Sequence, residues 1–115
     1  MQKKIVVATS EAPAAVGPYS QAIKTPGLVF TAGQLGLDPA SGEFAGADVA
    51  AQTHQAMENL RAVLKEAGSG LEHIVKTTIF VVDLAHFKIV NEVYGSFFGG
   101  EGGAPPARST VQVAA

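Results

Sequence analysis

One stretch of the chain has the apolar spacing of a long helix, and it limits the folds that the chain can adopt. Asp48 can cap the start of this helix and Gly68 can end it. The positions on the apolar side of this helix mostly recur every three or four residues, namely at Val49, Thr53, Ala56, Leu60, Val63, Leu64 and Ala67. A second stripe follows Asp83 and consists of Phe87, Val90, Tyr94 and Phe97. Gly95 weakens that second helix by about 1 kcal/mol relative to alanine.

Five other stretches are typical of β-strands: Lys4 to Thr9, Tyr19 to Lys24, Leu28 to Gln34, His73 to Val82 and Arg108 to Val113. The turn signal Thr25-Pro26-Gly27 predicts a hairpin between the second and third of them. Residues 79–82 are apolar on both faces, so we expect them in the middle of a sheet. The order β-β-β-α-β-α-β predicts an α+β fold, a mixed sheet with two helices packed on one face. We expect a single domain over residues 1–115.

The hydropathy of the chain indicates an oligomer. Hydrophobic residues make up 47% of the sequence and charged residues only 16%, and the mean hydropathy is +0.23. A small domain has much surface to cover with so few charges. Part of its apolar surface is therefore expected to be hidden between subunits of a homo-oligomer.

Charge and segment lengths exclude several partners. The net charge is −2, the pI is about 5.8, and the eight basic residues form no run longer than Lys3-Lys4, so we do not expect nucleic acid as a main partner. The apolar run at residues 5–8 is too short for a signal peptide. No stretch approaches the ~20 apolar residues of a membrane span. We expect a cytoplasmic protein without a membrane partner.

The sequence lacks the residues or motifs that several common kinds of catalytic and binding site require. The chain has no cysteine, which excludes disulfides, thiolate metal sites and a cysteine nucleophile. His54, His73 and His86 show no paired-ligand spacing, so no metal site is expected. The glycines at 99–103 are not followed by Lys-Ser/Thr, and we interpret them as a flexible connector rather than a phosphate loop. No Gly-x-Ser-x-Gly elbow is present.

Three segments keep a functional interpretation beside a structural one. Tyr19, at the start of a strand, can offer its hydroxyl to a ligand, or be a half-buried core tyrosine. Gly33, at the end of a strand, can allow close approach of a ligand, or form a simple bulge or turn. Arg108 stands where a loop meets a strand. Its rigid fork can grip a small carboxylate with two parallel hydrogen bonds, or lie solvated on the surface.

Taken together, these segments resemble the Rid family, also called YjgF, the reactive-intermediate or enamine/imine deaminases. The resemblance covers essentially the whole chain. It is carried by residues 12–22 (APAAVGPYSQA), 75–78 (VKTT), 90–94 (VNEVY) and 106–109 (PARS).

The resemblance implies a chorismate mutase-like fold, a homotrimer with a cleft at each subunit interface, and no cofactor. The activity that it implies is hydrolysis of 2-iminobutanoate and 2-iminopropanoate, the products of pyridoxal-phosphate-dependent threonine or serine dehydratases, to 2-oxo acids and ammonia. The carbon of a protonated C=N bond is already electrophilic. The protein therefore needs chiefly to hold the substrate, place a water and exclude side reactions.

The resemblance also implies roles for particular residues. Arg108 and Tyr19 are implied as catalytic: Arg108 clamps the substrate carboxylate and Tyr19 orients substrate or water. Ala32 and Gly33 form a backbone wall, and the main chain around Thr110 lies close to the imine nitrogen. Residues from two subunits make one site.

The chain departs from the family pattern at a few positions. Ala32 stands where Ser is common, Pro105 where Phe is common, and Thr110 where Cys often occurs. Relatives continue with a Leu-Pro turn and a final strand, whose glutamate is thought to position the hydrolytic water. We expect residues 1–115 to be a shortened form that lacks this strand, and imine hydrolysis to be slow if the native chain ends at Ala115.

Two alternatives to the deaminase stay open. One is a non-catalytic trimer that uses Arg108 to bind a 2-oxo or amino acid as a sensor or regulator, which absence of the glutamate favours. The other is a ribonuclease or translation inhibitor, a role attached to some relatives. The acidic pI and the lack of a basic patch argue against the latter.

Overall fold

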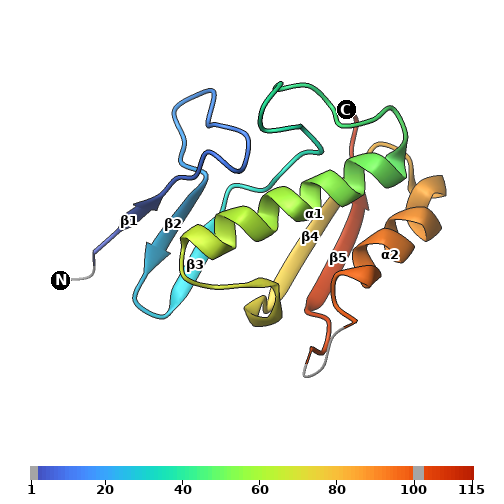
Figure 1. The fold of residues 1–115 in the computed structure, drawn as a ribbon. Coiled ribbons are helices and arrows are strands. Elements are labelled where there is room, and N and C mark those ends of the chain that lie inside the picture. Colours follow the sequence, from blue (N-terminus) through green and yellow to red (C-terminus); the bar gives the residue numbers. More distant parts are fainter. Residues whose placement is uncertain (1–2, 100–102) are drawn as a thin grey trace.

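The computed structural model describes residues 3–99 and 103–115, and the connector expected at 99–103 lies largely outside them. The elements are β1 (Ile5–Val7), β2 (Ala22–Thr25), β3 (Leu28–Thr31), α1 (Val49–Glu66), β4 (Lys76–Val81), α2 (Phe87–Ser96) and β5 (Ala107–Gln112). Short 3-10 turns at Leu71–His73 and Leu84–His86 precede β4 and α2. The predicted order of strands and helices is confirmed (Figure 1). Neither helix of these residues is long and apolar enough to cross a membrane.

The strands form two sheets rather than the single mixed sheet that we expected. β1, β2 and β3 are antiparallel in that order, and β4 pairs with β5 in parallel. The hairpin of β2 and β3 is confirmed, with Thr25 opposite Leu28 and Gly27 at φ +87°. Within residues 3–99 and 103–115, no ladder joins β3 to β4.

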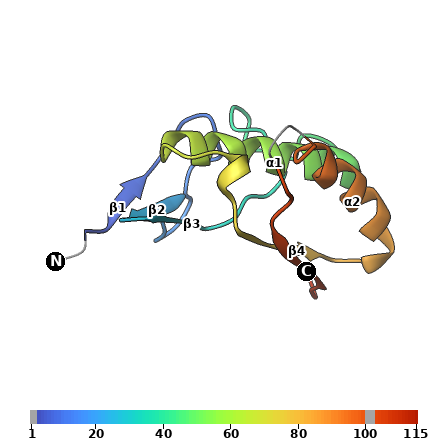
Figure 2. The ribbon, with the colours of Figure 1, turned by 90° about the horizontal axis from the view of Figure 1, so that it is seen from below.

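The expectation that residues 79–82 lie in the middle of a sheet is wrong for the single chain. β4 pairs only with β5 among the described strands, and the side chains of Phe80 and Val82 are 66% and 62% exposed. Both helices lie on one side of the strands (Figure 2). The apolar residues on the opposite side of β4 therefore have no second layer to cover them.

The core lies between α1 and the two sheets. Val63 of α1 and Ala67, which follows its last residue, pack with Val7 and Ala22 of the three-stranded sheet. A second cluster joins α1 to α2 and β4, and contains Met57, Leu64, Leu71, Tyr94 and Phe98, with Ile79 packed against it. α1 thus bridges both sheets, which places β4, β5 and α2 relative to the hairpin.

Both predicted ends of α1 are confirmed. Asp48 Oδ1 accepts a hydrogen bond from Ala51 N at 2.7 Å. At the other end Gly68 has φ +82°, its N–H donates to Lys65 O at 3.0 Å, and Ser69 N donates to Leu64 O at 2.8 Å. This is the Schellman arrangement, which satisfies carbonyls that the last turn would otherwise leave unpaired. Asp83 caps the 3-10 turn before α2, by accepting from Ala85 N at 2.9 Å, rather than α2 itself.

A buried side chain of α1 holds the loop that follows β3. Asn59 is 1% exposed, and its Nδ2 donates to Leu35 O at 3.1 Å and to Leu37 O at 2.8 Å. Between them, Gly36 lies so close to α1 that an added Cβ would stand 2.5 Å from Gln52 O. The loop that begins with residues 32 and 33 is therefore held against the helix a few residues further on.

Candidate active site

β5 presents two of the predicted site residues to a cavity beside α2. Arg108 and Thr110 are two positions apart on the strand, so they point to the same side of the sheet, the side that α2 covers. The cavity has a volume of about 390 Å³ and is lined by Leu84, Phe87, Arg108 and Thr110. It therefore combines two apolar side chains, a hydroxyl and a guanidinium.

Aromatic rings hold the Arg108 head group. Its Cζ lies 5.4 Å from the centre of the Phe87 ring and 5.2 Å from that of Tyr94. Among the described residues, no carboxylate lies within 4.0 Å of the guanidinium and no hydrogen bond involves its side-chain donors. The cavity thus contains a permanent positive charge whose N–H groups are available to an anion.

Two side-chain polar atoms are buried without a hydrogen-bond partner in the described part of the chain. One is Oγ1 of Thr110, and the other is Oδ1 of Asn91. Asn91 follows Phe87 by four residues and precedes Tyr94 by three, so the three share one face of α2. Sequence reasoning did not single out Asn91. The signal was present, because it is a polar residue one helical turn from aromatic members of the stripe.

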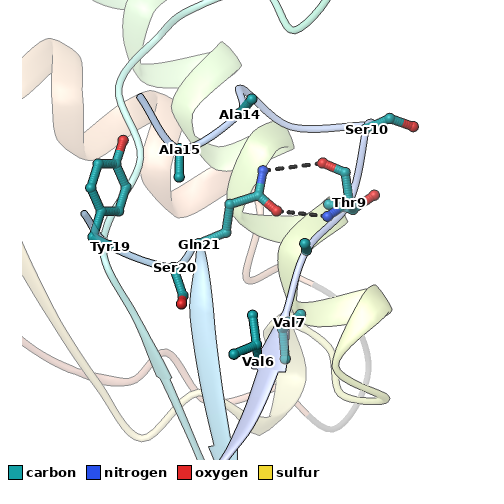
Figure 3. A pocket seen from close by; sticks show the side chains of 10 residues that line it. Val6, Val7, Thr9, Ser10, Ala14, Ala15, Tyr19, Ser20 and Gln21 are labelled. Carbon is teal, nitrogen blue, oxygen red and sulfur yellow. Dashed lines mark hydrogen bonds between the residues drawn. The ribbon is translucent and has the colours of Figure 1, made fainter. Parts of the chain in front are cut away.

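Tyr19 lies in a different pocket, between β1 and the loop before β2 (Figure 3). This pocket has a volume of about 320 Å³, and its lining also includes Val6, Thr9, Ala15 and Gln21. Tyr19 is 51% exposed and belongs to neither hydrophobic cluster of the described residues, so it is half-buried but not a core residue. Its hydroxyl oxygen accepts a hydrogen bond from Val16 N at 3.4 Å.

Gln21 fixes the loop that carries Tyr19. The Gln21 side chain is buried, and its Oε1 accepts from Thr9 N at 2.6 Å. Its Nε2 donates to Thr9 O at 3.1 Å (Figure 3). It also donates to Pro13 O at 2.8 Å. One glutamine therefore ties together both ends of the segment between β1 and β2.

Ala32 and Gly33 lie beside the Tyr19 segment. Ala32 N donates to Gln21 O at 3.0 Å, and both residues are exposed. Gly33 has φ +94°, a conformation that favours glycine, and apart from its chain neighbours no atom of the described residues lies within 4 Å of where its Cβ would be. The predicted residues thus fall into two groups in one chain. Arg108 and Thr110 line the cavity at α2. Tyr19, Ala32 and Gly33 lie at the end of the three-stranded sheet where β2 begins and β3 ends.

Comparison with known proteins identifies the family. A family model described as "Endoribonuclease L-PSP" matches residues 9–115. The chain belongs to this family, the Rid (YjgF) family. The resemblance found in the sequence is therefore confirmed, and the small α+β fold with two helices is that of solved Rid structures.

Several relatives carry deaminase names, and two of them illustrate the similarity. "Reactive Intermediate Deaminase A, chloroplastic" of Arabidopsis thaliana is 54% identical over 114 residues, which are 98% of this chain and 59% of that protein. The chain thus spans about 59% of the length of that relative. "2-iminobutanoate/2-iminopropanoate deaminase" of Mus musculus is 44% identical over 110 residues, 96% of this chain and 79% of the mouse protein.

A solved Rid structure is similar over most of its length. It is E. coli TdcF with bound serine, with a TM-score of 0.91 and 41% identity, covering 96% of this chain and 86% of the TdcF chain.

Proposed function

We propose that this protein hydrolyses 2-imino and enamine acids, such as 2-iminobutanoate and 2-iminopropanoate, to 2-oxo acids and ammonia. The observation that carries the proposal is the Arg108 guanidinium in the cavity at α2, with no carboxylate partner among the described residues. It is the group that a small α-carboxylate needs. The deaminase names of the relatives, and the serine in the TdcF structure, agree with a ligand of this kind.

In this proposal the reaction starts from the protonated imine, which carries its own electrophilic carbon. Arg108 holds the carboxylate, and the apolar side chains of Leu84 and Phe87 accommodate a short aliphatic chain. Water adds to the C=N carbon, and one of its protons passes to the nitrogen. The C–N bond then breaks as the remaining hydroxyl proton is lost to solvent, which releases ammonia and the 2-oxo acid. The Thr110 hydroxyl, buried and unpaired within the described residues, can accept a hydrogen bond from the iminium N–H or from the water.

We further propose that the site is completed between copies in a homotrimer. Tyr19, Ala32 and Gly33 of one copy would approach Arg108 and Thr110 of the next. The apolar residues exposed on the sheet side away from the helices support an association of copies. They include Leu28, Phe30, Phe80 and Val111.

A coupled assay tests the activity. Threonine dehydratase is supplied with threonine, and free imine is trapped with semicarbazide. Added protein is expected to reduce the trapped imine, and Arg108→Ala is expected to remove the effect. Undiminished trapping with the unaltered protein would exclude the hydrolysis.

Mixing two variants tests the shared site. Arg108→Ala and Tyr19→Ala are each expected to be inactive as pure oligomers. If each site takes its arginine and its tyrosine from different copies, random mixing of equal amounts restores about a quarter of the sites. No recovery after unfolding and refolding the mixture would show that one copy supplies both residues.

The second candidate function is binding without catalysis, as a sensor or regulator for 2-oxo or amino acids. None of the four described residues that line the cavity is a carboxylate or a histidine that could act as general base, which favours this reading. The same assay separates the two functions. A sensor binds 2-oxobutanoate through Arg108 but leaves the amount of trapped imine unchanged.

Cleavage of RNA, which the description of the family model names, does not fit the charge of this chain. Cleavage of RNA needs several cations on one face to hold phosphates, and the chain has a net charge of −2.

A further inference from the structure

The two arginines of the chain, Arg61 and Arg108, have different partners. Arg61 lies over the Phe97 ring, with its Cζ 5.1 Å from the ring centre, and its Nη1 also donates to Glu58 Oε1 at 3.0 Å. Arg108 lies over two rings and, among the residues described, has no carboxylate within 4.0 Å. Only Arg61 has a neutralising partner in this part of the chain.

The two rings that contact Arg108 lie on the same face of α2. Phe87 and Tyr94 are seven residues apart on α2, so they lie two turns apart on one helix face. The guanidinium lies within 6 Å of both ring centres, the range in which a cation is attracted to the face of an aromatic ring.

The Tyr94 ring is held in place by Thr77 and Phe98. Tyr94 is 6% exposed, its hydroxyl is 2.7 Å from Thr77 Oγ1, and its ring centre is 4.8 Å from that of Phe98. Thr77 is the residue opposite Arg108 in the ladder of β4 and β5. Thr77 therefore connects the two ends of Arg108. It lies opposite the Arg108 backbone in the sheet, and its hydroxyl is bonded to Tyr94, whose ring contacts the Arg108 guanidinium.

The kind of partner determines what the guanidinium can still do. A carboxylate occupies N–H donors in the plane of the fork and neutralises its charge. An aromatic face attracts the cation through its quadrupole and leaves the in-plane donors unoccupied. Rings can thus restrict the rotamers of the side chain before binding, which lowers the entropy cost of holding a ligand.

We infer that Phe87 and Tyr94, with Thr77 behind Tyr94, are positioning residues that hold Arg108 in a receptive state for a small carboxylate. This inference rests on the proposed function for the nature of the ligand. It adds to that function an explanation of how the Arg108 guanidinium is held in place by aromatic rings while its N–H donors stay free for the ligand.

Calorimetric binding of 2-oxobutanoate to the full chain tests the role of Phe87, which is partly exposed and can be changed with little risk to folding. Phe87→Leu keeps an apolar side chain but removes the ring face, and is expected to weaken binding about fivefold. Phe87→Tyr restores a ring face and is expected to bind as the unaltered protein does. In the hydrolysis assay, the loss in Phe87→Leu appears as a higher KM with kcat little changed, because the carboxylate is held equally before and during reaction.

A matched control and a coupled pair complete the test. Phe97→Leu removes the ring under Arg61 and is expected to leave binding unchanged. Thr77→Val and Tyr94→Phe break the same hydrogen bond from its two ends. Each is expected to weaken binding by the same factor, and the double variant by no more than either alone.

The outcomes are distinct from those that test the proposed function. If Phe87→Leu binds within twofold of the unaltered protein, or Phe87→Tyr loses as much affinity as Phe87→Leu, the inference is wrong even where hydrolysis is observed. If the unaltered protein binds 2-oxobutanoate but hydrolyses no imine, and the variants behave as expected, the inference stands and the deaminase proposal fails. An unaltered protein that binds no 2-oxobutanoate overturns the inference.

Discussion

Buried polar side chains follow two different patterns in this chain. Asn59 uses both its donor and its acceptor, bonding to two loop carbonyls and to Gln55 Nε2 at 2.8 Å. Thr110 Oγ1 and Asn91 Oδ1 have no partner within residues 3–99 and 103–115. A satisfied buried group stabilises the fold, whereas an unpaired one lowers its stability and is typical of a site that receives a ligand.

Replacing Asn59 is expected to lower stability. Asn59→Leu leaves the Leu35 and Leu37 carbonyls without their donor, and should reduce the free energy of unfolding by about 2 kcal/mol. Urea denaturation at a fixed protein concentration measures the change. An unchanged midpoint would mean that water replaces the amide without cost.

Replacing Thr110 is expected to raise the stability of the fold. Thr110→Val removes the unpaired hydroxyl at nearly constant volume in a β-strand, and should raise the free energy of unfolding by about 1 kcal/mol. Imine hydrolysis should fall in the same variant, because the acceptor in the cavity is lost. A variant that is more stable and fully active would remove the Thr110 hydroxyl from the proposed mechanism.

At the scale of elements, glycines illustrate how helix ends and helix interiors differ. Gly68 follows α1 with φ +82°, and Gly95 lies inside α2 without a positive φ. Apart from chain neighbours and the backbone of α2, a Cβ at Gly68 would meet Lys24 Nζ at 3.6 Å, and a Cβ at Gly95 would meet no atom of the described residues within 4 Å. Backbone conformation, rather than crowding, therefore decides the effect of alanine at each position.

The same substitution at the two glycines is expected to change stability in opposite directions. Gly68→Ala should destabilise the protein by about 1 kcal/mol, because alanine is strained at positive φ. Gly95→Ala should stabilise it by about 0.5–1 kcal/mol, because glycine is a poor residue in a helix interior. Thermal and urea unfolding of both variants provide the comparison. Equal signs would contradict the assigned backbone conformations.

At the scale of the whole molecule, the uncovered side of the sheets and the separation of the site residues both favour association between copies of the chain. One chain presents Arg108 and Tyr19 in separate pockets, and it exposes apolar side chains on the sheet side that the helices leave uncovered (Figure 2). Association of copies through that side would bury the apolar residues.

A charge on the uncovered side of the sheet tests this association. Phe80 lies on β4 with 66% of its surface exposed, so Phe80→Glu leaves the core of the single chain intact. We expect light scattering to give a trimer mass for the unaltered protein and a monomer mass for the variant, with circular dichroism unchanged. Thr78→Glu, on the same side but replacing a small polar residue, shows whether charge alone has this effect. A monomeric unaltered protein would contradict the proposed homotrimer.

The sequence by itself determined the order of the elements, the ends of α1, the hairpin and the family. These depend on neighbours in the chain: a cap acts within three residues, a helical stripe repeats every three or four, and a tight turn needs glycine at one position. Arg108 was recognisable for the same reason, from the residues on either side of it.

Only the tertiary structure decided which residues meet. The sequence did not predict that the strands divide into two sheets, that Arg108 rests on Phe87 and Tyr94, or that Tyr19 lies in another pocket. The contacts of Arg108 depend on the pairing of β4 with β5 and on the packing of α2 against β4. Such contacts join segments tens of residues apart, and their free energy comes from burial and ring geometry that no local spacing encodes.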